Sequence, residues 1–215
     1  MFHRYPAIVL FALCAGAPVM AQLMPQFNCM VTLESPTTVR AEGVTEQLND
    51  LVITCTGGQP TPSGLPVPTS NFQLLLNGNV SNPNITNRLD ASPYVDAFLM
   101  IDEPHSVANP NVPLLACTDT CTILGTGTGA GTYNGTAGRP NVFPAYAVAG
   151  LQNSIAWLHV PMDPPGASGV RTIRITNVRA NAASLSLASG NQVTGSNICP
   201  VQNTDRILTE MCPCS

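Results

Sequence analysis

Asp102, Glu103 and His105 form the densest group of residues in this sequence that could perform chemistry. They stand in FLMIDEPH at residues 98–105, directly after a run of four apolar residues. A carboxylate or an imidazole can act as a general base, and both can bind a metal ion. One hypothesis is therefore a hydrolase or a metal-dependent site at this position. Two acids and a histidine in a turn are also typical of a solvated loop, which is the alternative interpretation.

The same stretch resembles the Walker-B strand of transport ATPases, and TCTGGQP at 54–60 resembles a second signature of those proteins. An ATPase of this kind also needs G-x-x-x-x-G-K-[ST], whose lysine reaches the β- and γ-phosphates. All eight basic residues of this chain are arginines, so that lysine is missing. Residues 98–101 are better interpreted as a buried strand that ends at 102–104, because proline has no N–H to donate to a sheet.

Other catalytic and metal-binding patterns are weak. The chain has no G-x-S-x-G motif, and His159 in AWLHVP is expected to lie partly buried on a strand beside Trp157. A glycosidase needs two facing carboxylates, and the aromatic residues that would stack on a sugar are only 5% of the chain. Oxygen ligands for Ca²⁺ occur in DASPYVD and TDT, but no D-x-D-x-D-G loop is present. We therefore predict no cofactor, with Ca²⁺ as the alternative.

The first 21 residues have the features of a secretory signal peptide. His3 and Arg4 give a basic start, residues 7–17 are apolar, and residues 19–21 match a small-residue cleavage pattern. No other stretch approaches the ~20 apolar residues that cross a bilayer, so no membrane span is expected. The sequence predicts a secreted protein that is extracellular or attached to the cell surface.

The charge content is low for a globular protein. Charged residues are 9% of the chain, and the net charge is −4, whereas about a quarter of residues are charged in typical domains. Without a basic patch, nucleic acid is not an expected partner. Surfaces with so few charges are common in secreted β-proteins and in proteins that stack against copies of themselves.

The cysteine pattern supports export. An exported chain is expected to oxidise its thiols. Seven cysteines follow the predicted cleavage site: Cys29, Cys55, Cys117, Cys121, Cys199, Cys212 and Cys214.

Alternation with apolar residues places Cys29 of FNCMVTL and Cys55 of LVITC on the apolar faces of two strands, which predicts a bridge between them. CTDTC at 117–121 is spaced to close a tight turn. Cys199 is expected to pair with Cys212 or Cys214, and the thiol left over is either free or intermolecular.

Short apolar segments predict an all-β protein. Twenty prolines and seventeen glycines divide the chain, and helical periodicity is nearly absent. The stretch at 41–50 is expected to be a hairpin connection, and GTGTGAG at 125–131 a flexible loop. Trp157 is expected to anchor the core. The predicted strands are 28–33, 36–41, 50–56, 70–77, 95–102, 112–116, 120–124, 141–148, 154–160 and 170–179.

Many short strands with turns between them predict an antiparallel β-sandwich, immunoglobulin-like or jelly-roll-like, tied by disulfides. We place the signal peptide at 1–21, the sandwich domain at 22–190 and a cysteine-bearing C-terminal tail at 191–215. Residues 182–197 are expected to hold either a further edge strand or a linker.

Three runs, TTVRAEGVTEQLNDLVITCTGG, FLMIDEP and TIRITNVRANAASL, resemble an N-terminal β-rich module of uncharacterised secreted bacterial proteins. In those proteins the module precedes long arrays of immunoglobulin-like repeats. The resemblance covers about residues 28–185 and implies no activity, because none is established for that module. This chain differs in stopping after a short cysteine-bearing tail.

Together these features predict a non-enzymatic structural or adhesive module of the bacterial cell surface or extracellular matrix. Its expected partners are copies of itself or other surface proteins. The first alternative is a filament subunit that assembles by strand donation, with QLMPQFNCMVTL after the cleavage site as the donor strand. The second alternative is an enzyme or metal site around Asp102, Glu103 and His105.

Overall fold

The computed structural model describes residues 25–33, 39–85, 94–117, 120–184 and 195–201. The predicted signal peptide at 1–21 lies outside the described residues. The described residues form strands, and their single helix is the 3-10 turn η1 (Ala182–Ser184). The strands are β1 (Asn28–Leu33), β2 (Glu46–Gln47), β3 (Leu51–Gly57), β4 (Thr69–Leu76), β5 (Asn79–Val80), β6 (Tyr94–Ile101), β7 (Val142–Ala147), β8 (Ser154–Pro161), β9 (Gly166–Thr176), β10 (Arg179–Asn181) and β11 (Gly195–Val201).

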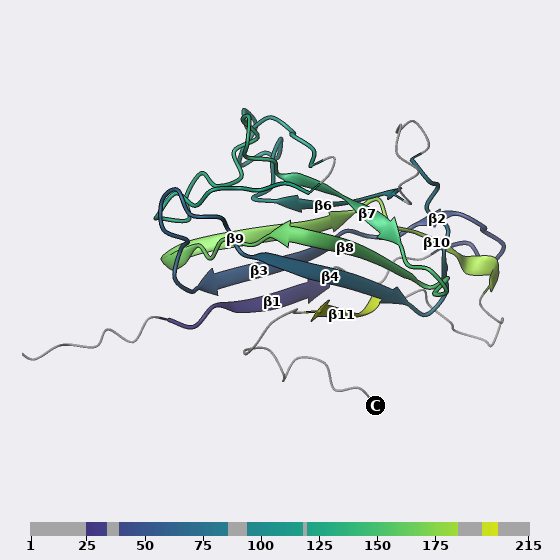
Figure 1. Cartoon of the computed structure of the whole chain (residues 1–215). Helices are drawn as coiled ribbons and strands as arrows, with labels where there is room; N and C mark the ends of the chain where they lie inside the picture. Colours follow the sequence, from purple (N-terminus) through teal and green to yellow (C-terminus); the bar gives the residue numbers. More distant parts are fainter. Residues whose placement is uncertain (1–24, 34–38, 86–93, 118–119, 185–194, 202–215) are drawn as a thin grey trace, which may run out of the picture.

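Eight of these strands form one sheet in the order β1-β3-β9-β6-β7-β8-β4-β11 (Figure 1). A smaller sheet has the order β2-β10-β5 and lies at one end of the large sheet. Every strand pair in both sheets is antiparallel. The all-β, antiparallel prediction is therefore confirmed.

The large sheet curls around one hydrophobic core. Ile53 of β3 lies opposite Ile173 of β9, and both belong to the same buried cluster as Phe72 of β4 and Trp157 of β8. Strands from the two halves of the sheet thus face each other, as in a sandwich. Burying each side chain of this size contributes about 1.5–3 kcal/mol. Trp157 is fully buried, which confirms its expected place in the core.

The alternation of apolar residues in the sequence predicted the positions of most long strands correctly. Residues 51, 53, 55 and 57 of β3 are buried, and the residues between them are partly or fully exposed. The prediction at 170–179 merged two strands, β9 and β10, and missed the start of β9 at Gly166. The predictions that match the structure to within two residues at each end are 28–33, 50–56, 70–77, 95–102, 141–148 and 154–160.

The predicted strands at 112–116 and 120–124 are wrong, because each segment makes only an isolated bridge. The backbone up to Cys117 is held by three backbone bonds to residues 141 and 142 and by one side chain. Leu115 N donates to Asn141 Oδ1 over 2.9 Å, and Asn141 Nδ2 donates to Pro113 O over 2.9 Å. These side-chain bonds add to the few backbone bonds of a segment that does not form a continuous strand ladder.

The small sheet was not predicted. The stretch at 41–50, expected to be a hairpin connection, contains β2, which pairs with β10. The predicted strand at 36–41 does not form at 39–41, and its remainder lies outside the described residues. Strands of two or three residues leave too little alternation to be recognised in a sequence.

β11 extends the large sheet beyond the domain boundary placed at residue 190. It pairs with β4 and forms one edge of the sheet, while β1 forms the other. Part of the expected C-terminal tail therefore belongs to the sheet. The edge strand or linker expected at 182–197 overlaps β11 only at residues 195–197, and residues 185–194 lie outside the described residues.

Two disulfides join residues of the described region. Cys29 is bonded to Cys55, as predicted, and these residues are direct partners across β1 and β3, with Cα atoms 4.0 Å apart. Cys117 is bonded to Cys121 and closes the predicted tight turn. The expected bridge from Cys199 to Cys212 or Cys214 involves positions outside the described residues.

The Cys29–Cys55 bond should contribute more to stability than the Cys117–Cys121 bond. It closes a sequence separation of 26 residues against 4, so the chain-entropy model gives about 3–4 kcal/mol for the first and about 2 kcal/mol for the second. Urea unfolding of C29A/C55A and C117A/C121A, followed by the fluorescence of Trp157, measures both losses. A larger loss in C117A/C121A would contradict this account.

Candidate functional site

β6 ends at Ile101, and the chain then turns sharply, as predicted from the sequence. Asp102, Glu103 and His105 have φ angles of 60°, 44° and 60°. Positive φ costs of the order of 1–3 kcal/mol at residues other than glycine. The turn is held by Asp102 N, which donates to Thr172 O over 2.7 Å. It directs both acidic side chains towards β9.

Asp102 forms an ion pair with Arg171 of β9. The Arg171 side chain is 2% exposed, and that of Asp102 is 29% exposed. Burial raises the pKa of Asp102 above its usual value, while the charge of Arg171 and its hydrogen bond act in the opposite direction. The carboxylate is the counter-ion of a buried guanidinium.

Arg171 also bonds to the backbone of two loops. Its Nε and Nη2 donate to Asp163 O over 3.1 and 3.0 Å, and Nη2 also donates to Gly129 O over 2.7 Å. Its guanidinium carbon lies 4.6 Å from the centre of the Tyr133 ring. This buried arginine therefore ties the end of β6 to the loops on either side of β7 and β8.

Asp163 completes the same buried network. Its Oδ1 accepts from Thr61 N and its Oδ2 accepts from Thr132 Oγ1, each over 2.7 Å. Asp163 N donates to the Tyr133 hydroxyl, which donates to Pro161 O over 2.8 Å. Burial raises the pKa of Tyr133, so this hydroxyl stays protonated as a donor.

Glu103 is paired in the same way, nearer the surface. Arg174 bonds to its Oε1 through Nε at 3.1 Å and through Nη2. Arg174 Nη1 donates to Asp50 Oδ2 over 3.2 Å. Partial burial lowers the pKa of Arg174, but the bonds and charges of Glu103 and Asp50 outweigh it and raise the pKa overall.

The structure thus brings Asp102 and Glu103 to arginines of β9. The His105 side chain is exposed. Within the described ranges, no three acidic, histidine or cysteine side chains are grouped as metal ligands. Both carboxylates are instead bonded to guanidinium groups, Asp102 to Arg171 and Glu103 to Arg174. The geometry of the turn favours a structural role over the general-base or metal hypothesis.

The expectation that His159 lies partly buried beside Trp157 is wrong. The register between β4 and β8 shifts between Ser70 and Phe72, and His159 has a φ of 56° and an exposed side chain. Its backbone N–H donates to Asn71 Oδ1 over 2.8 Å. This β-bulge interrupts the alternation, so His159 and Trp157 do not share a face.

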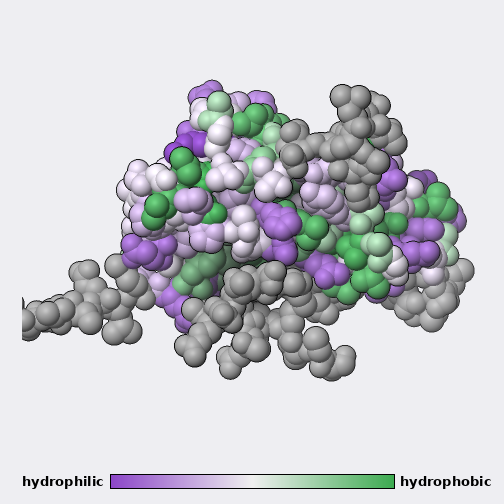
Figure 2. Space-filling model, viewed as in Figure 1, coloured by the Kyte–Doolittle hydropathy of each residue, from purple (hydrophilic) through white to green (hydrophobic). Residues whose placement is uncertain are grey.

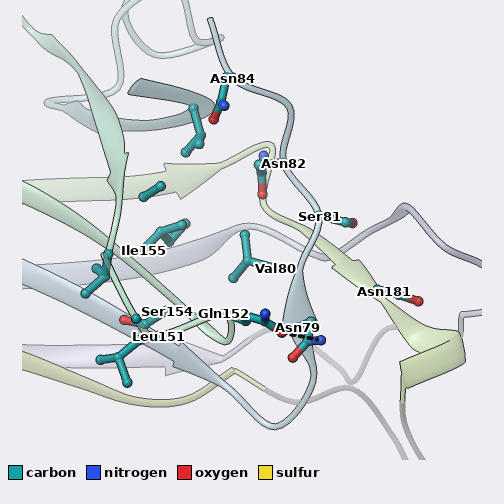
Figure 3. Close-up of a pocket in the computed structure, with 14 residues that line it drawn as sticks. Asn79, Val80, Ser81, Asn82, Asn84, Leu151, Gln152, Ser154, Ile155 and Asn181 are labelled. Carbon is teal, nitrogen blue, oxygen red and sulfur yellow. Dashed lines mark hydrogen bonds between the residues drawn. The ribbon is translucent and has the colours of Figure 1, made fainter. Parts of the chain in front are cut away.

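A pocket of about 400 Å³ lies between the small sheet and the turn that joins β7 to β8 (Figure 3). We call it the amide pocket, because five carboxamide residues line it: Asn79, Asn82, Asn84, Gln152 and Asn181. No charged residue lines it. The sequence signal is the run of asparagines in NGNVSNPN at 77–84, a composition that by itself indicates only a turn. The pocket could not be predicted from that run, because Gln152 and Asn181 are distant in the chain.

No family model, curated protein or solved structure matches this chain. The resemblance to an N-terminal module of secreted bacterial proteins therefore stays a prediction. Across the described part of the chain, no helix is long and apolar enough to cross a membrane.

Replacing Arg171 should destabilise the protein far more than replacing Arg174. Arg171→Met leaves Asp102 without its counter-ion and two buried carbonyls without donors, which should lower the free energy of unfolding by about 3–5 kcal/mol. Arg174→Met is the matched control. Its side chain is 27% exposed, and loss of a partly solvated pair should cost about 1 kcal/mol or less.

Urea unfolding of the oxidised variants measures both changes without the charge screening that guanidinium salts introduce. Equal losses in the two variants would show that the buried network does not have the stabilising role described above.

Proposed function

We propose that this protein is a secreted, non-enzymatic structural or adhesive module of the bacterial cell surface or extracellular matrix. The two disulfides found among the described residues are typical of an oxidising, extracellular-type compartment. The predicted signal peptide supports export. The observation that carries the proposal is the open edge of the large sheet at β1.

Within the described residues, β1 is an edge strand with little protection against pairing. It contains no charged residue and no proline, and Met30 and Val31 on its two faces are 69% and 45% exposed. Natural proteins usually block such edges with charges, prolines or bulges, because an unblocked edge pairs with another chain. An unblocked edge is expected where pairing is part of the function.

The backbone of β1 offers hydrogen bonds to a partner. The Cα distance of 4.0 Å between Cys29 and Cys55 is that of a non-hydrogen-bonded pair in an antiparallel ladder. The N–H and C=O groups of Cys29 and Val31 therefore point away from β3. A strand from another molecule could bond to them by β-augmentation.

The low charge of the chain fits the same role. Figure 2 shows small apolar areas separated by polar ones on the visible face of the molecule. Charged residues are 9% of the sequence, so two copies would meet with little repulsion. The expected partners are further copies of this chain or other surface proteins.

The filament alternative takes a modified form. Residues 28–33 pair with β3 in their own chain, and Cys29 is bonded to Cys55. Strand donation by this segment would require breaking that ladder and that bond. We therefore favour β1 as an edge that accepts a strand over β1 as a strand that is donated. Because Asp102 and Glu103 are paired with arginines, the proposal places no catalysis at the 102–105 turn.

A charge on β1 should weaken association by about tenfold or more, an energy of roughly 1.4 kcal/mol. Met30→Lys introduces it at the edge. Val170→Lys is the matched control, because Val170 is 58% exposed on the same outer face but lies in β9, two strands from the edge. Val31→Pro removes one outward N–H and should act like Met30→Lys, since the bonds to β3 are kept.

Analytical ultracentrifugation of the mature, oxidised protein measures self-association, and fractionation of the producing cells measures its retention at the surface. The wild type and Val170→Lys should associate or be retained, and the two β1 variants should not. A wild type that stays monomeric at all concentrations and is released freely into the medium would overturn the proposal.

A further inference from the structure

We infer that the amide pocket is a binding site for a neutral, polyhydroxylated ligand, namely a saccharide. The inference deepens the proposed adhesive role. It rests on that role only because an extracellular location would bring the protein into contact with sugars of the cell surface or matrix. Its physical basis is the set of unused hydrogen-bonding groups around the pocket.

One amide of the pocket is already committed to the fold. Asn82 Nδ2 donates to Asp96 Oδ1 over 2.8 Å and to Asn177 O over 2.7 Å, and Asn82 Oδ1 accepts from Arg179 N over 2.7 Å. Both donors and the acceptor of this carboxamide are used. Asn82 therefore fixes the wall of the pocket and leaves little for a ligand.

The side chains of Asn79, Asn84 and Gln152 each keep a hydrogen-bonding group that no other described residue uses. Asn79 Nδ2 donates to Gln152 Oε1 over a long 3.3 Å. Among the described residues, Asn79 Oδ1, Gln152 Nε2 and the Asn84 carboxamide make no further bond. In Figure 3, Asn84 lies at one end of the pocket, and Asn79 and Gln152 lie at the other. The two ends together offer both donors and acceptors, which is what hydroxyl groups require.

The middle of the pocket is aliphatic. Val80 and Ile155 lie between the two polar ends in Figure 3, and Leu151 adds to the lining near Gln152. Ser81 and Asn181 complete the wall, but their side chains point away from Val80 in this view. Polar ends with an aliphatic middle match a sugar ring, which has hydroxyls at its rim and C–H groups on its faces.

Charge and backbone geometry exclude other classes of ligand. No charged side chain lines the pocket, so an ion has no counter-charge there. A peptide that binds by strand addition needs free backbone groups. Val80 N already donates to Gln152 O over 2.8 Å, and Ser81 N donates to Arg179 O over 2.9 Å.

The volume of the pocket, about 400 Å³, falls in the range of small-molecule sites, about 300–1,000 Å³.

No aromatic residue lines the pocket, so no ring stacks on the sugar, and binding should be weak for a single site. Many copies held side by side at a surface would raise the effective affinity through multivalency. Weak single-site binding is consistent with a module that acts as an assembly.

The test uses the mature, oxidised chain, labelled with ¹⁵N, and a panel of neutral oligosaccharides built from glucose, galactose, mannose or N-acetylglucosamine. Amide chemical shifts of residues 79–84 and 150–155 should move on titration with at least one member. Asn79→Ala/Gln152→Ala should weaken binding by about tenfold or more, because two hydrogen bonds are lost. Gln47→Ala is the matched control, as Gln47 is exposed on β2 of the same small sheet.

No shift with any sugar at millimolar concentration, shifts that map away from the pocket, or equal weakening in the control would each overturn the inference. Saturable shifts at the pocket with short uncharged peptides, and none with sugars, would also overturn it. Met30→Lys should bind the same sugar as the wild type. A protein that binds sugar but neither associates nor is retained at the cell surface would refute the β1 proposal alone. A protein that associates or is retained but binds no sugar would refute the saccharide site alone.

Discussion

The buried guanidinium of Arg171 is the constraint on which the rest of this fold depends. Arg171 occupies an inward position on β9, directly opposite Cys55 and two residues before Ile173, a core residue. A charge in such a place costs several kcal/mol unless it is paired and fully hydrogen-bonded. Asp102, the carbonyls of Gly129 and Asp163, and the ring of Tyr133 meet that requirement.

The same requirement explains the unusual backbone around it. The positive φ of Asp102 and Glu103 brings their carboxylates within reach of β9. Part of the glycine-rich stretch at 125–131, expected to be a flexible loop, is packed closely: a Cβ on Gly129 would lie 2.5 Å from Pro164 O. Glycine allows the loop to come near enough for its carbonyl to accept from Arg171. The strained backbone at Asp102 and the close packing at Gly129 thus both serve the buried charge of Arg171.

Sequence reasoning succeeded where one face of a strand is buried and failed where a single residue changes the pattern. Ile53, Ile173 and Ile175 lie inside as alternation predicts, but the bulge beside His159 is not visible in that pattern. Alternation also places Arg171 inside with Ile173, and a charged residue at an inward position could have indicated the buried network. The amide pocket could not be found this way, since Asn79 and Gln152 are separated by 73 residues. Their meeting depends on the docking of the small sheet.

The edge strand β1 raises the question of what keeps it in place. Few of its side chains are buried. Phe27, just before the strand, and Cys29, within it, are partly buried against the core, while Met30 and Val31 are exposed. Apolar burial alone therefore holds this strand weakly. The ladder to β3 adds hydrogen bonds whose net contribution is modest, so the Cys29–Cys55 bond is what makes separation from β3 costly. An edge that is covalently retained, and that no other described strand covers on its outer side, could accept a partner without being released itself. In the proposed role, this would distinguish β1, as a fixed acceptor edge, from a strand that exchanges between molecules.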